Sequence, residues 1–287
     1  MSFFASSDIW HRSNGVLLFT VTFQPHHRIR TMKKVLNAAW FLLVAVQAQA
    51  EQSTQWQVTL GAGGAIITTP WAGMATQHQS LPFVSAQYGR WRFGVDQGLV
   101  SYRVLDSQVG IDMGLNFRDP SYDSVLLYKS DLSDDPVFTS YDDPSGELVA
   151  TMALNYHGFS ARFAQDISNE SSSLAANVSY TLSPWALSDK LRVHTRFGVR
   201  LLSEDYTQHF YGVSRVQAAP QYGRTEYHSQ GAINPFARVA LSYQFAPQWQ
   251  AVAAYRSEFW DDEIYHSPLV STHYTHQLMV FFTYRLR

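Results

Sequence analysis

The residues of this sequence with the most capacity for chemistry are arginines and carboxylates that alternate with apolar residues. Between Lys190 and Leu201, for example, Arg192, Arg196 and Arg200 share one face of an extended segment. Successive side chains of a β-strand point to opposite faces, so this spacing predicts strands with one charged face. Assigned in this way, the polar faces collect eight arginines and four acids: Arg92, Arg162, Arg192, Arg196, Arg200, Arg238, Arg256 and Arg285, with Asp96, Asp112, Asp166 and Glu258.

Two interpretations of this charged set stay open. The arginines and carboxylates could pair with one another and fill the interior of a narrow fold. Alternatively, the excess of arginine could line a pore that favours anions. Arg192, Arg196 and Arg200 are close enough on one strand face to repel one another, unless acids or anions lie between them.

Other kinds of site find less support. His228-Ser229 and His266-Ser267 could supply a base and a nucleophile, but a catalytic triad is recognised by geometry, and nothing in the spacing indicates one. We therefore predict no enzyme and no catalytic residues. Carboxylates cluster between the predicted strands without the spacing of a calcium loop, so we predict no metal and no cofactor.

The composition excludes several classes of protein. The chain has no cysteine, which rules out zinc–cysteine sites and disulfides. A net charge of −2 and a pI of about 6.6 argue against a nucleic-acid partner. Charged residues make up only 15% and aromatic residues another 15%, while the mean hydropathy is −0.18. Disordered chains are poor in aromatic residues, and helical membrane proteins need long apolar runs, so a large β protein remains.

Alternation with a period of two continues through most of the chain, and aromatic residues recur at the ends of the segments. Strands are predicted near 55–67, 81–88, 91–102, 107–117, 122–129, 147–156, 159–166, 173–182, 190–203, 231–245, 249–259 and 276–286. Strands of 10–12 residues suit a tilted crossing of a bilayer, although a soluble sandwich also has one apolar face. We predict an all-β, transmembrane, antiparallel up-and-down β-barrel of about twelve strands, with ten possible.

The connections between these strands alternate between short and long. Short gaps are predicted at 89–90, 118–121, 157–158, 183–189 and 246–248, and longer gaps include 103–106, 130–146, 204–230 and 260–275. In outer-membrane barrels the short turns face the periplasm and the long loops face outward. Within 204–230, the residues around His209 and Glu226 are predicted to extend the strands.

The N-terminal fifty residues have a different organisation. Residues 32–50 combine two lysines, a short apolar run and an Ala-Gln-Ala end, which is the pattern of a cleaved signal peptide. We interpret residues 1–31 as an over-called N-terminal extension, residues 32–50 as the signal peptide and residues 51–287 as the barrel. Removal of residues 1–50 takes away five bases and one acid and leaves a net charge of −6.

Several short motifs, in a consistent order, carry a resemblance to a known family. They are Tyr211-Gly212-Val213-Ser214, then Asp262 with Ser267-Pro268, preceded by Thr69-Pro70-Trp71 and followed by Phe282-Thr283-Tyr284. These segments resemble the MipA/OmpV family of outer-membrane proteins, and the resemblance covers residues 55–287. The middle of the chain (118–150) and the closing Arg287 depart from the family pattern.

The resemblance implies a location and a function. It implies a barrel in the bacterial cell outer membrane, in contact with lipid and lipopolysaccharide, and it brings no catalytic residues. It also implies a scaffold that links a periplasmic murein hydrolase to a murein synthase. A small porin-like channel with an anion-favouring lumen, or a surface adhesin, is the alternative.

Overall fold

The computed structural model describes residues 55–94, 98–120 and 134–286. The predictions for residues 1–50, for Asp96 and for a strand at 122–129 lie outside these residues. The strands are β1 (Gln57–Ile67), β2 (Gln77–Tyr88), β3 (Trp91–Gly94), β4 (Gly98–Asp106), β5 (Val109–Arg118), β6 (Glu147–Tyr156), β7 (Phe159–Asp166), β8 (Leu174–Thr181), β9 (Trp185–Ala186), β10 (Leu191–Leu202), β11 (Ala232–Ala246), β12 (Trp249–Phe259) and β13 (Tyr274–Leu286).

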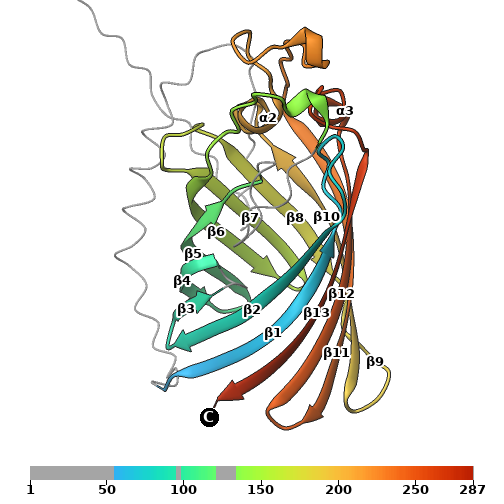
Figure 1. Cartoon of the computed structure of the whole chain (residues 1–287). Helices are drawn as coiled ribbons and strands as arrows, with labels where there is room; N and C mark the ends of the chain where they lie inside the picture. The colour runs from blue at the N-terminus through green and yellow to red at the C-terminus, as the bar shows by residue number, and fades with distance from the viewer. Residues whose placement is uncertain (1–54, 95–97, 121–133, 287) are drawn as a thin grey trace, which may run out of the picture. The chain divides into compact units, whose positions relative to one another are not determined.

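The strands form one closed antiparallel sheet (Figure 1). Apart from β8 and β9, each strand pairs with its neighbour in the sequence, and β13 pairs with β1 from Val58↔Leu286 to Ile67↔Gln277. Both β8 and β9 pair with β10 and continue one another. Counted as one interrupted strand, they bring the described part of the barrel to twelve strands, which confirms the predicted fold class.

Alternation along the strands gives the barrel two unlike surfaces. Leu60, Met113, Phe197, Val239 and Phe282 are among the large apolar side chains that remain exposed on the outer wall. A belt of this kind is costly in water, and lipid is the solvent in which it is stable. Aromatic residues meet in pairs near the ends of the strands, such as Trp56 with Tyr88 and Trp249 with Tyr284, as expected for an interfacial girdle. Among the described residues, no helix combines the length and apolar character needed to cross a membrane.

Five short connections gather at one end of the barrel. Four of them contain two residues (89–90, 107–108, 157–158 and 247–248), and 187–190 contains four. At the 157–158 turn, both His157 (φ 42) and Gly158 (φ 88) adopt the left-handed backbone that two-residue hairpins require. By the rule for outer-membrane barrels, this end faces the periplasm.

One predicted strand was wrong. Residues 91–102 are not a single strand, because β3 turns back to pair with β4 (Trp91↔Tyr102, Phe93↔Val100). Gly94 (φ 120) and Gly98 (φ 92) bracket this reversal in a backbone conformation that other residues rarely adopt. Consequently residues 103–106 belong to β4 and do not form an outward loop. The strand β5 runs opposite to its predicted direction, so the predicted periplasmic turn after it, which begins at Arg118, is also wrong.

The long outer connections fold into a cap. They include η2 (Pro136–Phe138), α2 (Glu204–Tyr211), η3 (Pro220–Tyr222) and α3 (Asp262–Tyr265). The prediction of extended strand around His209 was therefore wrong. Ser203 accepts a hydrogen bond from the backbone of Tyr206, and Glu204 and Asp205 occupy the first turn, so a capped helix forms instead.

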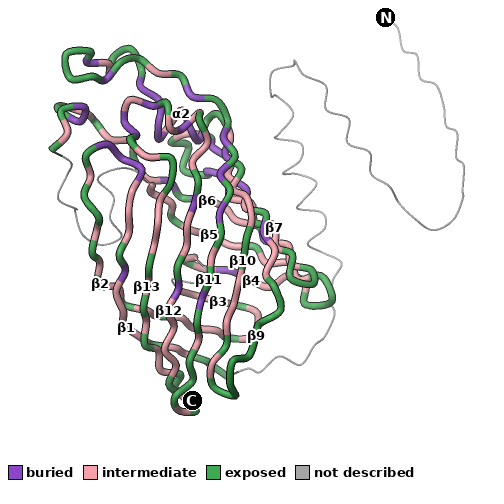
Figure 2. Tube along the Cα trace, turned by 90° about the vertical axis from the view of Figure 1, so that its right-hand side faces the viewer, coloured by how far each residue is buried: buried purple, intermediate pink, exposed green. Residues whose placement is uncertain are grey.

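The buried core of the protein lies in this cap. Figure 2 shows that buried positions concentrate at the end of the barrel that carries α2, whereas the wall is mostly intermediate or exposed. The cluster contains Phe210, Val213, Ile264 and Leu269, which have no exposed surface. Trp71, from the loop after β1, stacks on Tyr211 with ring centroids 5.0 Å apart. Loops from distant parts of the sequence therefore share one apolar core above the lumen.

Candidate functional site

The residues that carry the family resemblance meet inside the cap. The hydroxyl of Ser267 donates a hydrogen bond of 2.7 Å to the backbone oxygen of Tyr211 and accepts one from the backbone of Leu269. Val213 is fully buried and forms a β-bridge with Tyr227. Gly212 caps the end of α2, at a position where a side chain would collide with Gln208. These motif residues thus hold the cap together.

The remaining motif residues lie at the edge of the same structure. Ser214 begins a turn and exchanges hydrogen bonds with Gln217. Asp262 opens α3 and accepts a backbone hydrogen bond from His266 through its carbonyl, and Pro268 follows between the buried Ser267 and Leu269. Their position indicates a structural role at the outer end of the barrel.

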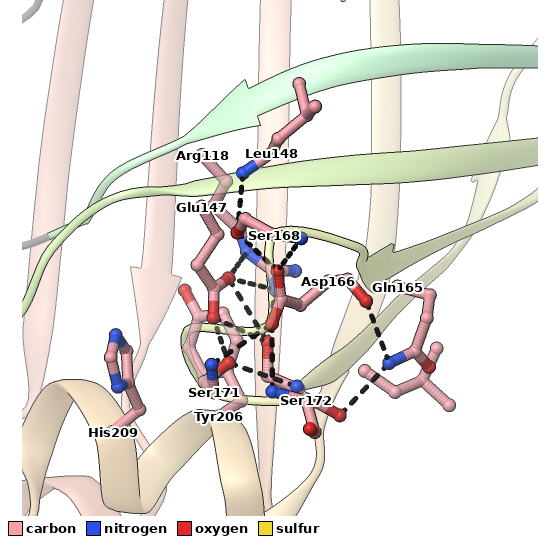
Figure 3. Close-up of polar contacts among 12 residues, drawn as sticks. Arg118, Glu147, Leu148, Gln165, Asp166, Ser168, Ser171, Ser172, Tyr206 and His209 are labelled. Carbon is pink, nitrogen blue, oxygen red and sulfur yellow. Dashed lines mark hydrogen bonds and ion pairs between the residues drawn. The ribbon is translucent and has the colours of Figure 1, made fainter.

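Beneath the cap, Arg118 and Glu147 form a buried ion pair at the ends of β5 and β6 (Figure 3). Arg118 Nε donates to Glu147 over 2.8 Å, and the hydroxyls of Ser171 and Ser173 also contact this fully buried carboxylate. The guanidinium lies 4.8 Å from the ring centroid of Tyr206 in α2. The charged wall and the cap are therefore in direct contact.

Sequence reasoning missed this pair. The alternation of the sequence predicts a periplasmic turn at Arg118 and only the start of a strand at Glu147. The available signal was their position, since they flank the same long loop, and opposite charges at facing strand ends are favourable.

A second charged group surrounds Glu258 on β12. Arg200 Nε lies 3.0 Å from one carboxylate oxygen, without the angle of a hydrogen bond, and Arg256 donates to the other over 2.6 Å. Asn234 donates to the same carboxylate over 3.3 Å. The Arg200 guanidinium also packs 5.3 Å from the ring centroid of Trp260 at the start of the last outer loop.

A third group lies on the opposite wall. Arg92 contacts Asp112 over 3.4 Å, and Arg103, which the sequence analysis did not select, pairs with both Asp112 and Asp106. Asp166 forms no ion pair among the described residues. It caps its own loop instead, accepting from Ser168, Ser171 and Ser172 over 2.6–3.1 Å.

The other predicted lumen residues are not brought into these groups. Arg196 donates to Thr181 Oγ1 over 2.9 Å, and a buried Nε of Arg238 has no hydrogen-bond partner in the described structure. Arg162 lies opposite Asn177 and Arg192 opposite Ser242. Arg285 lines a separate small cavity at the periplasmic rim.

Burial also sets the protonation state of two tyrosine side chains in the cap. Burial raises the pKa of Tyr211 well above its usual value, and it raises the pKa of Tyr206 against the opposing influence of Arg200 and Arg118. Both phenols therefore stay neutral at physiological pH and act as packing groups and dipoles.

In both histidine–serine pairs of the sequence, the serine hydroxyl is hydrogen-bonded to a backbone carbonyl. Ser229 Oγ donates to the carbonyl of Glu263 over 2.9 Å, and Ser267 Oγ is held by Tyr211. Within the described ranges, no cluster of histidine and acidic side chains could hold a metal ion.

A closed antiparallel barrel with an apolar outer wall, a charged interior and short turns at one end defines an outer-membrane β-barrel protein. The profile of the family described as MltA-interacting protein MipA matches residues 36–286. The chain therefore belongs to this family.

Several individual proteins are similar to this chain. The MltA-interacting proteins of Escherichia coli K12 and Shigella flexneri are each 22% identical over 259 residues, which cover 88% of this chain and 100% of theirs. Among solved structures, the outer-membrane channel DcaP of Acinetobacter baumannii is similar at a TM-score of 0.33, with 10% identity over 84% of this chain and 99% of that one. OmpT of Vibrio cholerae also has a TM-score of 0.33, at 8% identity over 84% and 100%.

Proposed function

We propose that this barrel anchors an MltA-type murein hydrolase, together with a murein synthase, at the periplasmic face of the outer membrane. The observation that carries the proposal is the full-length match to two proteins named for their interaction with MltA. We further propose that the exported chain loses residues 32–50 as a signal peptide and that it has no enzymatic activity of its own. No catalytic residues come with the family.

The periplasmic rim offers one projecting element for such a partner. The hairpin of β9 and β10 continues past the end of β8 and is tied to β11 by a hydrogen bond from Gln244 to Lys190. Trp185, in β9 opposite Val193, is 70% exposed, and Leu187, in the turn that follows, is 53% exposed. Exposed aromatic and aliphatic residues on a rigid support are typical anchors of protein interfaces. We therefore place the docking point at Trp185 and Leu187.

The decisive experiment is a co-purification of the tagged barrel, in detergent, with the MltA counterpart of the same bacterium. The wild-type barrel retains this hydrolase and, through it or beside it, a murein synthase. The double variant Trp185→Ser, Leu187→Ser loses about tenfold or more of the retained hydrolase, because two anchors are removed. Val216→Ser, on an outer loop where Val216 is 96% exposed, is the matched control and leaves retention unchanged. Recovery of neither murein enzyme by the wild-type barrel contradicts the scaffold.

The porin-like alternative is less well supported by the geometry. Flow of solute needs an open bore, whereas α2 contacts Arg118 of β5 on one side and Trp71 of the first outer loop on another. The cap thus packs across the outer mouth.

A further inference from the structure

Three arginines form a row across adjacent strands of the lumen wall. Arg196 of β10 lies directly opposite Arg238 of β11, and Arg238 lies directly opposite Arg256 of β12. Residues in such positions have Cα atoms roughly 4.5–5.5 Å apart, and like charges there repel one another. The neighbours Ala237 and Val239 face outward, so the row faces the interior. An arrangement of this kind is unfavourable unless something negative lies beside it.

The described protein supplies too little negative charge for this row. Among the described residues, Glu258 is the only carboxylate that contacts the row, and it is already shared by Arg256 and Arg200. The other carboxylates of the described strands are engaged elsewhere: Asp106 and Asp112 with Arg103, Glu147 with Arg118, and Asp166 with its own loop. The Nε of Arg238 is buried without a hydrogen-bond partner. Glu258 therefore offsets the charge of Arg256 within the row, while Arg196 and Arg238 have no carboxylate partner among the described residues.

One member of the row, Arg196, is accessible from the periplasmic end. A cavity of about 340 Å³ is lined by the turns at 107–108 and 157–158, by the Arg103–Asp106 ion pair, by Thr181 and, from the row, by Arg196. Its volume lies at the lower end of the roughly 300–1,000 Å³ typical of small-molecule sites. The hydrogen bond from Arg196 to Thr181 fixes one guanidinium at the wall of this cavity. The cap packs over the opposite end, so we expect a ligand to enter and leave from the periplasm.

We propose that Arg196, Arg238 and Arg256 form a binding site for the phosphate group of a small periplasmic solute. Guanidinium forks donate paired hydrogen bonds to phosphate oxygens. Three forks on adjacent strands can engage a tetrahedral group through different oxygens, whereas a planar carboxylate offers only two. A bound phosphate supplies the missing negative charge and gives the unpaired Nε of Arg238 an acceptor. The site lies on the lumen wall and is independent of the docking of murein enzymes.

The test is isothermal titration of the purified, refolded barrel in detergent. Inorganic phosphate is compared with sodium chloride at equal ionic strength, and glycerophosphoglycerol, a soluble phospholipid headgroup, forms a second arm. Arg238→Gln and Arg196→Gln remove members of the row. Arg285→Gln is the matched control, because it removes the same charge from a separate cavity at the rim. Folding of each variant is checked by its shifted mobility on unheated gels.

The wild-type barrel binds phosphate, and the Kd rises by about tenfold or more in Arg238→Gln and Arg196→Gln, because each loses charge-assisted hydrogen bonds. Arg285→Gln stays within about twofold, as expected for a distant, partly screened charge. Without phosphate, Arg238→Gln melts no lower than the wild type, since it relieves repulsion. Tighter binding of inorganic phosphate identifies a free solute as the source, and tighter binding of the headgroup identifies lipid. No binding of either beyond chloride, or equal losses in all three variants, overturns the proposal.

Discussion

Replacement of Phe210 by alanine tests whether the cap is a separately folded unit. Phe210 is fully buried, and its ring contacts Tyr206 and His209 at centroid distances of 5.0 and 4.6 Å. Removal of a buried phenylalanine side chain costs about 3–5 kcal/mol, from lost transfer energy and from the cavity that remains. The strands below contribute little to this cluster, so the loss should fall on the cap.

The measurement is hydrogen exchange of backbone amides in detergent. Since each 1.4 kcal/mol is about a factor of ten in an opening equilibrium, amides of α2 (Glu204–Tyr211) should exchange about a hundredfold to a few thousandfold faster. Amides in the centre of β11 should keep the wild-type rate. Val216→Ala, at an exposed position of the same outer loop, is the control and should leave both rates unchanged.

Two results would refute this reasoning. An α2 exchange rate within threefold of the wild type would show that Phe210 does not stabilise the cap. Equal acceleration in α2 and β11 would show that cap and wall open as one cooperative unit.

Three further predictions concern the wall and the lumen. Glu147→Gln leaves the Arg118 charge buried without its partner and should lower the free energy of unfolding by about 3–5 kcal/mol. Urea titration followed by tryptophan fluorescence measures this change. The control is Glu226→Gln, in an exposed ion pair, which should change the free energy of unfolding by less than about 1 kcal/mol. Gly63→Ala places a methyl group against the backbone of β13 and should reduce the folded fraction on unheated gels; Gly64→Ala has more room, and a similar loss there would remove the steric explanation. The intact barrel should give no steady conductance in planar bilayers, and regular steps would show that the cap does not seal the mouth.

Much of the barrel was predictable because its physics is local. Alternation alone placed Arg92, Arg200 and Arg256 on the inner face and Phe197 on the outer face, since a strand gives each residue only two choices. The reversal at Gly94 and Gly98 was missed, because the apolar period continues through it. That single error reverses the predicted direction of β5. The contact between the end of β5 and Glu147 therefore could not be predicted.

The cap was beyond sequence reasoning for a different reason. Its core joins Trp71, Phe138, Tyr211 and Leu269, which come from four separate outer segments. No periodicity connects residues so far apart, and long aromatic loops resemble solvated ones. The one local signal was Ser203 followed by two acids, the start of a capped helix, and it was overlooked in favour of extended structure.

The position of the cap above the seam between β1 and β13 sets an order of events during biogenesis. Trp71 forms a β-bridge with Val270, and Ser271 donates a backbone hydrogen bond to Pro70, so the first and last outer loops are joined directly. These contacts can form only after the final strand has reached the first. The aromatic core of the cap is therefore packed only in a closed barrel. A chain that stops before closure would expose Trp71 and Tyr211, and proteases could distinguish it from a finished barrel.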